Sequence, residues 1–366
     1  MRKLFACLVF VISALVLLVA MNQSFINRVK QDRYFDHLNT GKRDNSVYHR
    51  LFIRSDRWRY GDLYGLSYLH QYKYQLEPFH QYTSRETGAA NNRVLYIVGD
   101  SFLADKRLKK AFSDFDEVIF LDRRFPYGPI VPDTTKKNYL VMEFAERNLV
   151  GYDLQTTETT WSADDIKQHK NFDALAAKQS PPGLPHGLER ISGLIFNKDL
   201  SRNLELLLFD DRLFTPVKEF KAAINYCFGR VAPEVAVSTD KKRLFLNMTV
   251  DTTQPESAFK PHTDNDIAQI NQKLAAADSY YQSIGFKGVF LSIIPNAVSV
   301  YDRNRMTYNN LLTRVETKTT VPVISIDSAF RQDHRNLFYK SDAHWNPAGF
   351  DEWVGLTDSY FKTHLN

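Results

Sequence analysis

The sequence predicts an α/β fold with a doubly wound, mainly parallel sheet, an inserted α+β region and an N-terminal membrane helix. Three observations lead to this prediction. Short apolar runs rich in β-branched residues alternate with segments of helical spacing, which is typical of a parallel sheet. This alternation stops at about residue 151 and resumes after about residue 250. The chain also starts with an apolar run that is long enough to cross a bilayer.

The N-terminal run, LFACLVFVISALVLLVAM at residues 4–21, carries no charge and follows two cations. As a helix it would extend about 27 Å, close to the hydrocarbon thickness of a bilayer. A cleaved signal peptide and an uncleaved signal anchor both fit this run, and the poor small-x-small cleavage site at Leu18 and Ala20 favours the anchor. Because cations before a span stay in the cytoplasm, we predict a single-pass protein of the bacterial inner membrane with its body in the periplasm.

The parallel sheet is predicted from short apolar runs bounded by polar residues or glycine. VLYIV, which directly precedes Gly99, is typical of a buried parallel strand. Later runs of the same character would complete the sheet. The predicted strands are residues 94–98, 117–121, 139–144, 288–294 and 322–326.

The helices are predicted from apolar spacing and from capping residues. Thr215 and Pro216 start one helix as N-cap and first-turn proline, and Gly229 follows its end. Asn346 caps a last helix that is opened by a proline and extends towards residue 360. Other predicted elements are a helix-like segment at 103–112, a loop at 180–187, a β-hairpin at 234–248 that turns near Asp240, and a helix at 264–284.

These elements divide the chain into five parts. Gly61 and Gly65 predict turns in a polar and aromatic stretch that we expect to pack on the main body. The region between the two halves of the core is read as an insertion or subdomain. The predicted parts are a signal anchor at 1–25, an N-terminal extension at 26–90, the first part of the α/β core at 91–150, the insertion at 151–250 and the second part of the core at 251–366.

Charge and cysteine content exclude several classes of function. The net charge is +5 with scattered basic residues, so the sequence carries no nucleic-acid footprint. Cys7 lies in the apolar run, which leaves Cys227 alone in the body and rules out an internal disulfide there. No cluster of cysteine and histidine has metal-ligand spacing, and we predict neither a metal site nor a cofactor.

Ser101 is the candidate nucleophile. It follows the first predicted strand in Gly99-Asp100-Ser101-Phe102, and the carboxyl end of such a strand is where open α/β sheets bind ligands. Backbone N–H groups at a strand-to-helix junction can stabilise an oxyanion, and Gly99 permits a tight turn there. The same tripeptide also forms ordinary turns and helix caps, which is the competing interpretation.

Asp342 and His344 are the candidate partners of this serine. A serine hydroxyl needs a general base, and a histidine base needs a carboxylate that fixes its tautomer. Their spacing in a loop lets the carboxylate reach the near ring nitrogen while the far nitrogen faces the serine. Alternatively, Asp342 caps a turn, His344 lies on the surface and Trp345 belongs to the core.

These residues resemble the SGNH (GDSL-like) hydrolase superfamily, and especially its alginate O-acetyltransferase-like branch. That branch carries a GDSF block and an Asp-x-His-Trp block, which correspond here to Gly99–Phe102 and Asp342–Trp345. Glu146-Arg147 and the segment IIPNAVSVYD are further similarities. The resemblance implies a flavodoxin-like fold. Here the serine block comes first, which is the order of the wider superfamily and not of the alginate branch.

The superfamily usually draws one oxyanion donor from a Gly-x-Asn-Asp block, which this chain lacks. The corresponding strand end holds Arg147 and Asn148, and either side chain would be the donor. A structural ion pair is the alternative for Arg147. Asn296 is a further substrate-binding candidate, with a turn position as its alternative.

The resemblance implies O-acyl transfer, with acetyl as the expected group, onto an exported cell-envelope or secreted polysaccharide. It also implies a membrane-bound partner that carries acyl groups, and the N-terminal anchor fits such a partnership. Two alternatives stay open. One is an esterase or deacetylase with the same three residues, and the other is a glycan-binding envelope protein without catalysis.

Overall fold

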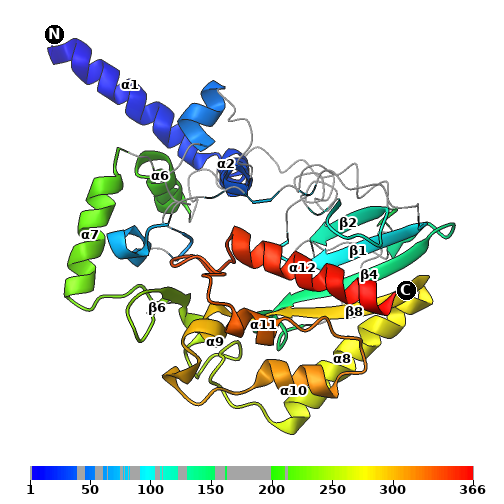
Figure 1. Ribbon diagram of the computed structural model, residues 1–366. Coiled ribbons are helices and arrows are strands. Elements are labelled where there is room, and N and C mark those ends of the chain that lie inside the picture. Colours follow the sequence, from blue (N-terminus) through cyan, green and yellow to red (C-terminus); the bar gives the residue numbers. More distant parts are fainter. Residues whose placement is uncertain are drawn as a thin grey trace.

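The chain folds around a parallel sheet with helices on both sides (Figure 1). The predicted α/β fold with a parallel sheet is therefore confirmed. The computed structural model describes residues 2–38, 46–53, 61–63, 65–74, 77, 79–80, 82, 91–103, 108, 110–122, 130–152, 161–162, 199–210 and 213–365. The loop predicted at 180–187 lies outside these residues.

The central sheet has four parallel strands in the order β2-β1-β4-β8. They are β1 (Arg93–Gly99), β2 (Glu117–Asp122), β4 (Lys137–Ala145) and β8 (Phe286–Ile294). The first four predicted strands are thus confirmed, because uninterrupted apolar runs of this length can be buried on both faces. All four strands run in the same direction, so their carboxyl ends meet at one edge of the sheet.

The prediction of a fifth strand at 322–326 is wrong. Only one parallel bridge forms there, between Val323 and Leu291 of β8. Pro322 has no N–H to donate, and the chain turns into α11 (Asp327–Gln332) directly afterwards. The apolar run therefore reaches the edge of the sheet but ends before a regular ladder can form.

Helices cover both faces of the sheet (Figure 1). Even-numbered residues of β1 share a buried core with α8 (Asp264–Ser283) and α10 (Leu311–Lys318). The odd-numbered apolar residues of β1 share a second core with α12 (Pro347–His364). The period-2 alternation of side chains along a strand thus places two separate helical layers on this sheet.

Local capping explains where several helices begin. Thr263 and Asp266 form a capping box at the start of α8, and the Asn346 side chain accepts from the Gly349 N–H at the start of α12. The helices predicted at 264–284 and from residue 346 are confirmed. The helix α7 (Thr215–Cys227) is also present, but Thr215 is its first helical residue and the cap position holds Phe214 without a side-chain bond.

Two further predictions concern shorter segments. The hairpin at 234–248 is confirmed as the antiparallel pair β6 (Val235–Val237) and β7 (Leu244–Leu246). Of the helix-like segment predicted at roughly 103–112, residues 108 and 110 have 3-10 helical geometry, whereas 103 lies in a turn and 111–112 are non-helical. Residues 104–107 and 109 of that prediction lie outside the described part of the chain.

The N-terminal extension packs on this hairpin. Leu63, Leu66 and Tyr72 form a buried cluster with Val235 of β6 and Leu244 of β7. This cluster holds residues 63–72 against the β6–β7 hairpin, although the two segments are far apart in the sequence. The remaining elements are η1 (His49–Ile53), η3 (Leu66–Tyr68), η4 (His70–Tyr72), β3 (Ile130–Val131), η6 (Glu146–Asn148), β5 (Trp161–Ser162), η7 (Asn247–Thr249), α9 (Ala297–Tyr301) and η8 (Arg303–Arg305).

The N-terminal helix α1 (Arg2–Met21) projects from the body (Figure 1). It is long and apolar enough to cross a membrane, and only 6% of its apolar window is buried. This helix is consistent with a signal sequence or with a single anchor. α2 (Gln23–Leu38) follows it after one residue, and α6 (Leu200–Leu208) packs against both.

Candidate active site

Strand β1 delivers Ser101 to the carboxyl edge of the sheet. A Cβ atom on Gly99 would lie 2.6 Å from the Glu143 Oε2 atom, so the glycine lets this carboxylate approach the backbone closely. The same oxygen accepts a hydrogen bond of 2.8 Å from the Asp100 N–H, and the Phe102 N–H donates to Asp100 Oδ1. These bonds hold the turn so that Ser101 is half-buried at its tip.

His344 links Ser101 to Asp342. Its Nε2 atom lies 2.8 Å from Ser101 Oγ, and its Nδ1 atom lies 2.6 Å from Asp342 Oδ1. Asp342 is buried, whereas 20% of the His344 side-chain surface is exposed. The structure therefore brings together the three residues that sequence analysis selected as nucleophile, base and orienting carboxylate, although 243 residues separate Ser101 from His344.

This geometry suits proton transfer from a serine hydroxyl. A neutral His344 that donates from Nδ1 to Asp342 leaves Nε2 free to accept the Ser101 proton. Burial disfavours the imidazolium, but the charge of Asp342 and its hydrogen bond outweigh burial, and the pKa of His344 is raised above its ordinary value. The arrangement can therefore activate Ser101 as a nucleophile and stabilise the cation that results.

Trp345 joins the loops that carry His344 and Ser101. Its indole Nε1–H donates to the Phe102 carbonyl oxygen at 3.1 Å, and its side chain is buried. The Phe102 ring also lies against the His344 imidazole, with ring centroids 5.1 Å apart. Trp345 thus holds the loop of His344 at a fixed distance from the turn of Ser101.

Asp62 is a site residue that the sequence analysis missed. Its Oδ1 atom accepts from the Ala343 N–H at 2.9 Å, and its own N–H donates to Asp342 Oδ2 at 3.2 Å. Its Oδ2 atom lies 3.7 Å from His344 Nδ1. The only signal in the sequence was a turn predicted at Gly61, and nothing local connects that turn to a loop 280 residues away.

Gly61 places Asp62 against this loop. Its φ angle is +79°, and a Cβ atom there would lie 1.9 Å from the Ser341 carbonyl oxygen. The Leu63 N–H donates to that same oxygen at 3.1 Å. Backbone conformation and close contact both require glycine at this position.

We expect Gly61→Ala to lower the free energy of unfolding by at least about 3 kcal/mol, because the new methyl group overlaps a backbone carbonyl. Gly65→Ala is the matched control. Gly65 also has positive φ, at +84°, but its nearest neighbour would lie 4.0 Å from an added Cβ. This control should cost only about 1–2 kcal/mol. Urea unfolding of both variants measures the difference, and equal losses would contradict a tight Gly61–Ser341 contact.

Replacement of Asp62 should change the pH dependence of any reaction that uses His344 as base. Burial and the neighbouring charge of Asp342 raise the pKa of Asp62 to about 6, although 24% of its side-chain surface is exposed. Above this pH the Asp62 carboxylate favours the imidazolium of His344. In Asp62→Asn the pKa of His344 should fall, so the acidic limb of kcat/KM should move to lower pH by less than about one unit.

The measurement is kcat/KM from pH 5 to pH 9 for the wild type, Asp62→Asn and a control, Asp278→Asn in α8. The control should leave the profile in place, because α8 lies on the far side of the sheet core from this loop. A limb that moved to higher pH in Asp62→Asn would contradict the assigned charge effect.

The two side chains predicted as alternative donors to an oxyanion, Arg147 and Asn148, contact the residues on either side of Ser101. The Arg147 guanidinium carbon lies 5.3 Å from the centroid of the Phe102 ring, and Arg147 forms no ion pair with the described residues. Its charge is close enough to disfavour the His344 cation. The Asn148 side-chain amide instead donates to Asp100 Oδ2 at 2.9 Å and braces the nucleophile turn.

Asn296 follows β8, two strands from β1. Its side chain is 2% exposed, and neither amide atom forms a hydrogen bond with the described residues. Its backbone N–H donates to Glu146 Oε2 at 2.8 Å. Asn296 is therefore a buried polar residue, and no contact between described residues joins its side chain to Ser101.

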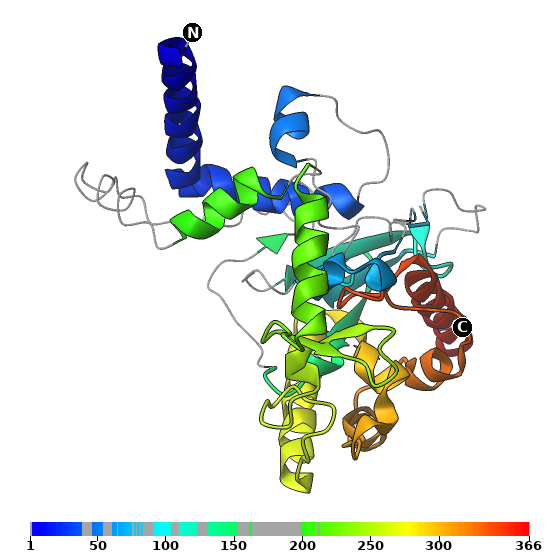
Figure 2. The ribbon, with the colours of Figure 1, turned by 90° about the vertical axis from the view of Figure 1, so that its left-hand side faces the viewer.

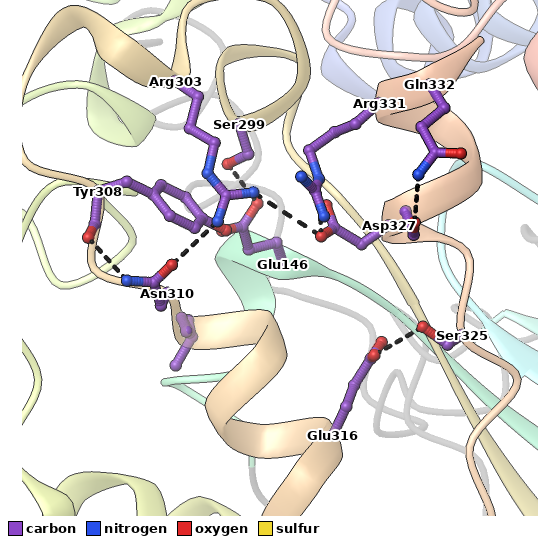
Figure 3. A network of polar contacts seen from close by, with 12 residues as sticks. Glu146, Ser299, Arg303, Tyr308, Asn310, Glu316, Ser325, Asp327, Arg331 and Gln332 are labelled. Atoms are coloured by element: carbon purple, nitrogen blue, oxygen red, sulfur yellow. Dashed lines mark hydrogen bonds and ion pairs between the residues drawn. The ribbon is translucent and has the colours of Figure 1, made fainter.

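Glu146 lies in a network of polar contacts (Figure 3). Its carboxylate accepts hydrogen bonds from Ser299 Oγ at 2.7 Å and from Tyr308 OH at 3.2 Å. Burial raises its pKa to about 7. Beside it, Asp327 pairs with Arg331 at 3.0 Å. Glu146 thus ties the end of β4 to the segment after β8 and leaves Arg147 to face the serine turn.

Asp62, Asp342 and His344 offer three ligand atoms within 4.8 Å of one another, a spacing that could hold a metal ion. A metal on His344 Nδ1 would replace its hydrogen bond to Asp342. His344 can therefore either hydrogen-bond Asp342 or bind a metal through Nδ1, but not both. The Nδ1–Oδ1 distance of 2.6 Å is that of a hydrogen bond.

Comparison of the chain with protein-family models, with curated proteins and with solved structures found no match. Its function is therefore inferred from the geometry of these side chains and from the two sequence blocks that carry them. Ser101 lies at a strand end and bonds His344 Nε2, and the carboxylates of Asp342 and Asp62 lie beside His344 Nδ1.

Proposed function

We propose that the chain is a membrane-anchored O-acyltransferase of SGNH type that transfers an acyl group, acetyl in the first instance, to an exported polysaccharide. The observation that carries the proposal is the continuous chain of contacts from Ser101 through His344 to Asp342. The parallel sheet with the serine at the end of β1 supports the SGNH assignment, as do the GDSF and Asp-x-His-Trp blocks.

The reaction has two symmetrical steps. First, Ser101 Oγ attacks the carbonyl carbon of the acyl donor while His344 takes the hydroxyl proton, and His344 then returns this proton to the leaving group. This step leaves an acyl ester on Ser101. In the second step a sugar hydroxyl loses its proton to His344 and attacks this ester. Ser101 then recovers the proton, and the glycan carries the acyl group.

Charge develops on the carbonyl oxygen in both steps. The Ser101 N–H at the end of β1 and the Arg147 guanidinium are the proposed donors to this oxyanion. Asn148 serves indirectly, since its amide holds Asp100 in the turn. The apolar helix α1 would keep the site close to a membrane-bound partner that supplies acyl groups.

Hydrolysis by the same three residues is the second candidate. Ser101 is half-buried and His344 is partly exposed, so water can compete with a sugar hydroxyl for the acyl-enzyme. The two reactions differ only in the acceptor, and they are separated by one experiment.

The experiment uses the full chain in detergent with p-nitrophenyl acetate, with and without a bacterial polysaccharide. The proposal predicts an acetyl adduct on the peptide that contains Ser101, and nitrophenol release that the polysaccharide accelerates as it becomes acetylated. Release that no polysaccharide accelerates, with free acetate as product, would indicate an esterase. A folded protein with neither adduct nor release would contradict both and favour a glycan-binding protein.

A further inference from the structure

The helix α7 turns an apolar face outwards. Exposed apolar residues of α7 and of its two flanks recur every three or four positions, which places them on one side of the helix. Leu213, Val217, Phe220 and Phe228 are 77%, 64%, 69% and 72% exposed, and Ile224 belongs to the same stripe. An exposed stripe of this kind on a soluble body marks a binding surface.

The opposite side of α7 is fixed to the body by a mixture of polar and apolar contacts. Ala222 is buried against Tyr68. The Lys218 ammonium lies 5.2 Å from the centroid of the Tyr68 ring and 3.3 Å from Asp210 Oδ1, and Glu219 forms an ion pair with Lys73. These contacts fix the rotation of α7 about its own axis, and the apolar stripe on its opposite side therefore faces outwards.

The same surface continues through α6 to the base of α1. The buried Asn203 amide of α6 donates to the Ala20 carbonyl oxygen and to Gln23 Oε1, both at 2.9 Å. Arg33 of α2 pairs with buried Asp210 at 2.7 Å, directly after α6. α6 and α7 lie on the side of the molecule from which α1 projects (Figure 1), and no described element covers α7 when that side faces the viewer (Figure 2).

We propose that the outward face of α6 and α7 lies in the interfacial region of the same lipid bilayer that α1 enters. α1 and this face are joined by buried contacts, so a bilayer around α1 is held next to the apolar stripe. Cations flank the stripe, as is typical of interfacial helices: Lys221 is exposed, and the Arg230 guanidinium lies 5.7 Å from the centroid of the Phe228 ring. The proposal is independent of the chemistry at Ser101.

The contact between Asn203 and Ala20 has a consequence for processing. Cleavage after Ala20 would separate this carbonyl from the helix that follows and would free the end that Asn203 holds. The proposal therefore includes that α1 stays attached as an anchor.

Cys227 provides a probe, since it is exposed on the outward face of α7 and the only other cysteine of the chain is Cys7. The full chain with Cys7→Ser, labelled at Cys227 with a polarity-sensitive fluorophore, is placed in vesicles of phosphatidylcholine and phosphatidylglycerol. We expect quenching by nitroxide-labelled lipids and protection from aqueous iodide. The matched control carries its label at Gln272→Cys in α8, with both native cysteines replaced by serine. This label should show the opposite pattern.

A second variant tests whether the stripe itself makes the contact. Leu213→Ser, Val217→Ser and Phe220→Ser together should reduce lipid quenching at Cys227 several-fold without lowering the melting temperature, because these side chains are already exposed. The proposal is overturned if the Cys227 label of the parent is as accessible to iodide as the Gln272→Cys label, which would indicate a bare or protein-binding surface. It is also overturned if the triple variant keeps its lipid quenching.

Discussion

Replacing Ser101 with alanine should reduce kcat/KM for acyl transfer by at least about 10³-fold while the free energy of unfolding changes by less than about 1 kcal/mol. Catalysis falls because the attacking oxygen is removed, and no other hydroxyl in the described part of the chain contacts the His344 ring. Stability is preserved because Ser101 is half-buried and belongs to neither hydrophobic core.

The measurement combines nitrophenol release, mass spectrometry of the Ser101 peptide and thermal unfolding. Ser283→Ala is the control, since this serine of α8 also makes a single side-chain hydrogen bond, at 2.6 Å to the Tyr280 carbonyl oxygen, but lies far from the site. An acetyl adduct that persisted elsewhere in Ser101→Ala, with turnover intact, would show that another residue is the nucleophile.

Asp342→Asn should lower kcat by about 10⁴-fold, the size of effect that a wrong imidazole tautomer produces. Asp342 accepts hydrogen bonds at both carboxylate oxygens, from the His344 N–H and ring at Oδ1 and from the Asp62 N–H at Oδ2. An amide has one oxygen and one NH₂ group. If its NH₂ group faces His344 Nδ1, the ring proton moves to Nε2, which then cannot accept the Ser101 proton.

This prediction separates the two carboxylates beside His344. Asp342 lies 2.6 Å from Nδ1 and Asp62 lies 3.7 Å from it, so only Asp342 is placed to fix the tautomer. Asp62→Asn should therefore retain most of the kcat at its optimum pH, whereas Asp342→Asn should lose it at every pH. Equal losses in the two variants would indicate that Asp62, not Asp342 alone, orients the imidazole.

Burial of Asp342 adds a cost in stability. One backbone N–H, of His344 or of Asp62, loses its acceptor when an amide replaces the carboxylate, and an unsatisfied buried N–H costs about 1–3 kcal/mol. Thermal unfolding of Asp342→Asn should show this loss, and the activity comparison must be made at a temperature where the variant remains folded.

The sequence by itself determined the parts of this protein that depend on short stretches of chain. An apolar run such as 94–98 is a strand wherever it is buried, and Asn346 caps α12 through a bond to a residue three positions away. Ser101, Asp342 and His344 were selected as candidates in the same way, because a serine at a strand end and a carboxylate two residues before a histidine are local patterns.

Only the tertiary structure decided which distant segments meet. Asp62 reaches His344 because its segment packs on the β6–β7 hairpin and because Gly61 tolerates contact with the Ser341 carbonyl group. The side chain of Asn148 turns to Asp100 for a similar reason, as an acceptor from another strand end lies within 2.9 Å.

Contacts between distant segments also decided the edge of the sheet and the orientation of α7. Residues 322–326 have the composition of a strand, but the turn into α11 leaves them a single bridge to β8. The apolar stripe of α7 is visible as a helical period, yet its outward direction depends on the partners of Lys218 and Ala222 on the other side. Local patterns fix what a segment can be. The free energy of burying it against a particular neighbour, summed over contacts between distant parts of the chain, fixes where it lies and which side chains it brings to the site.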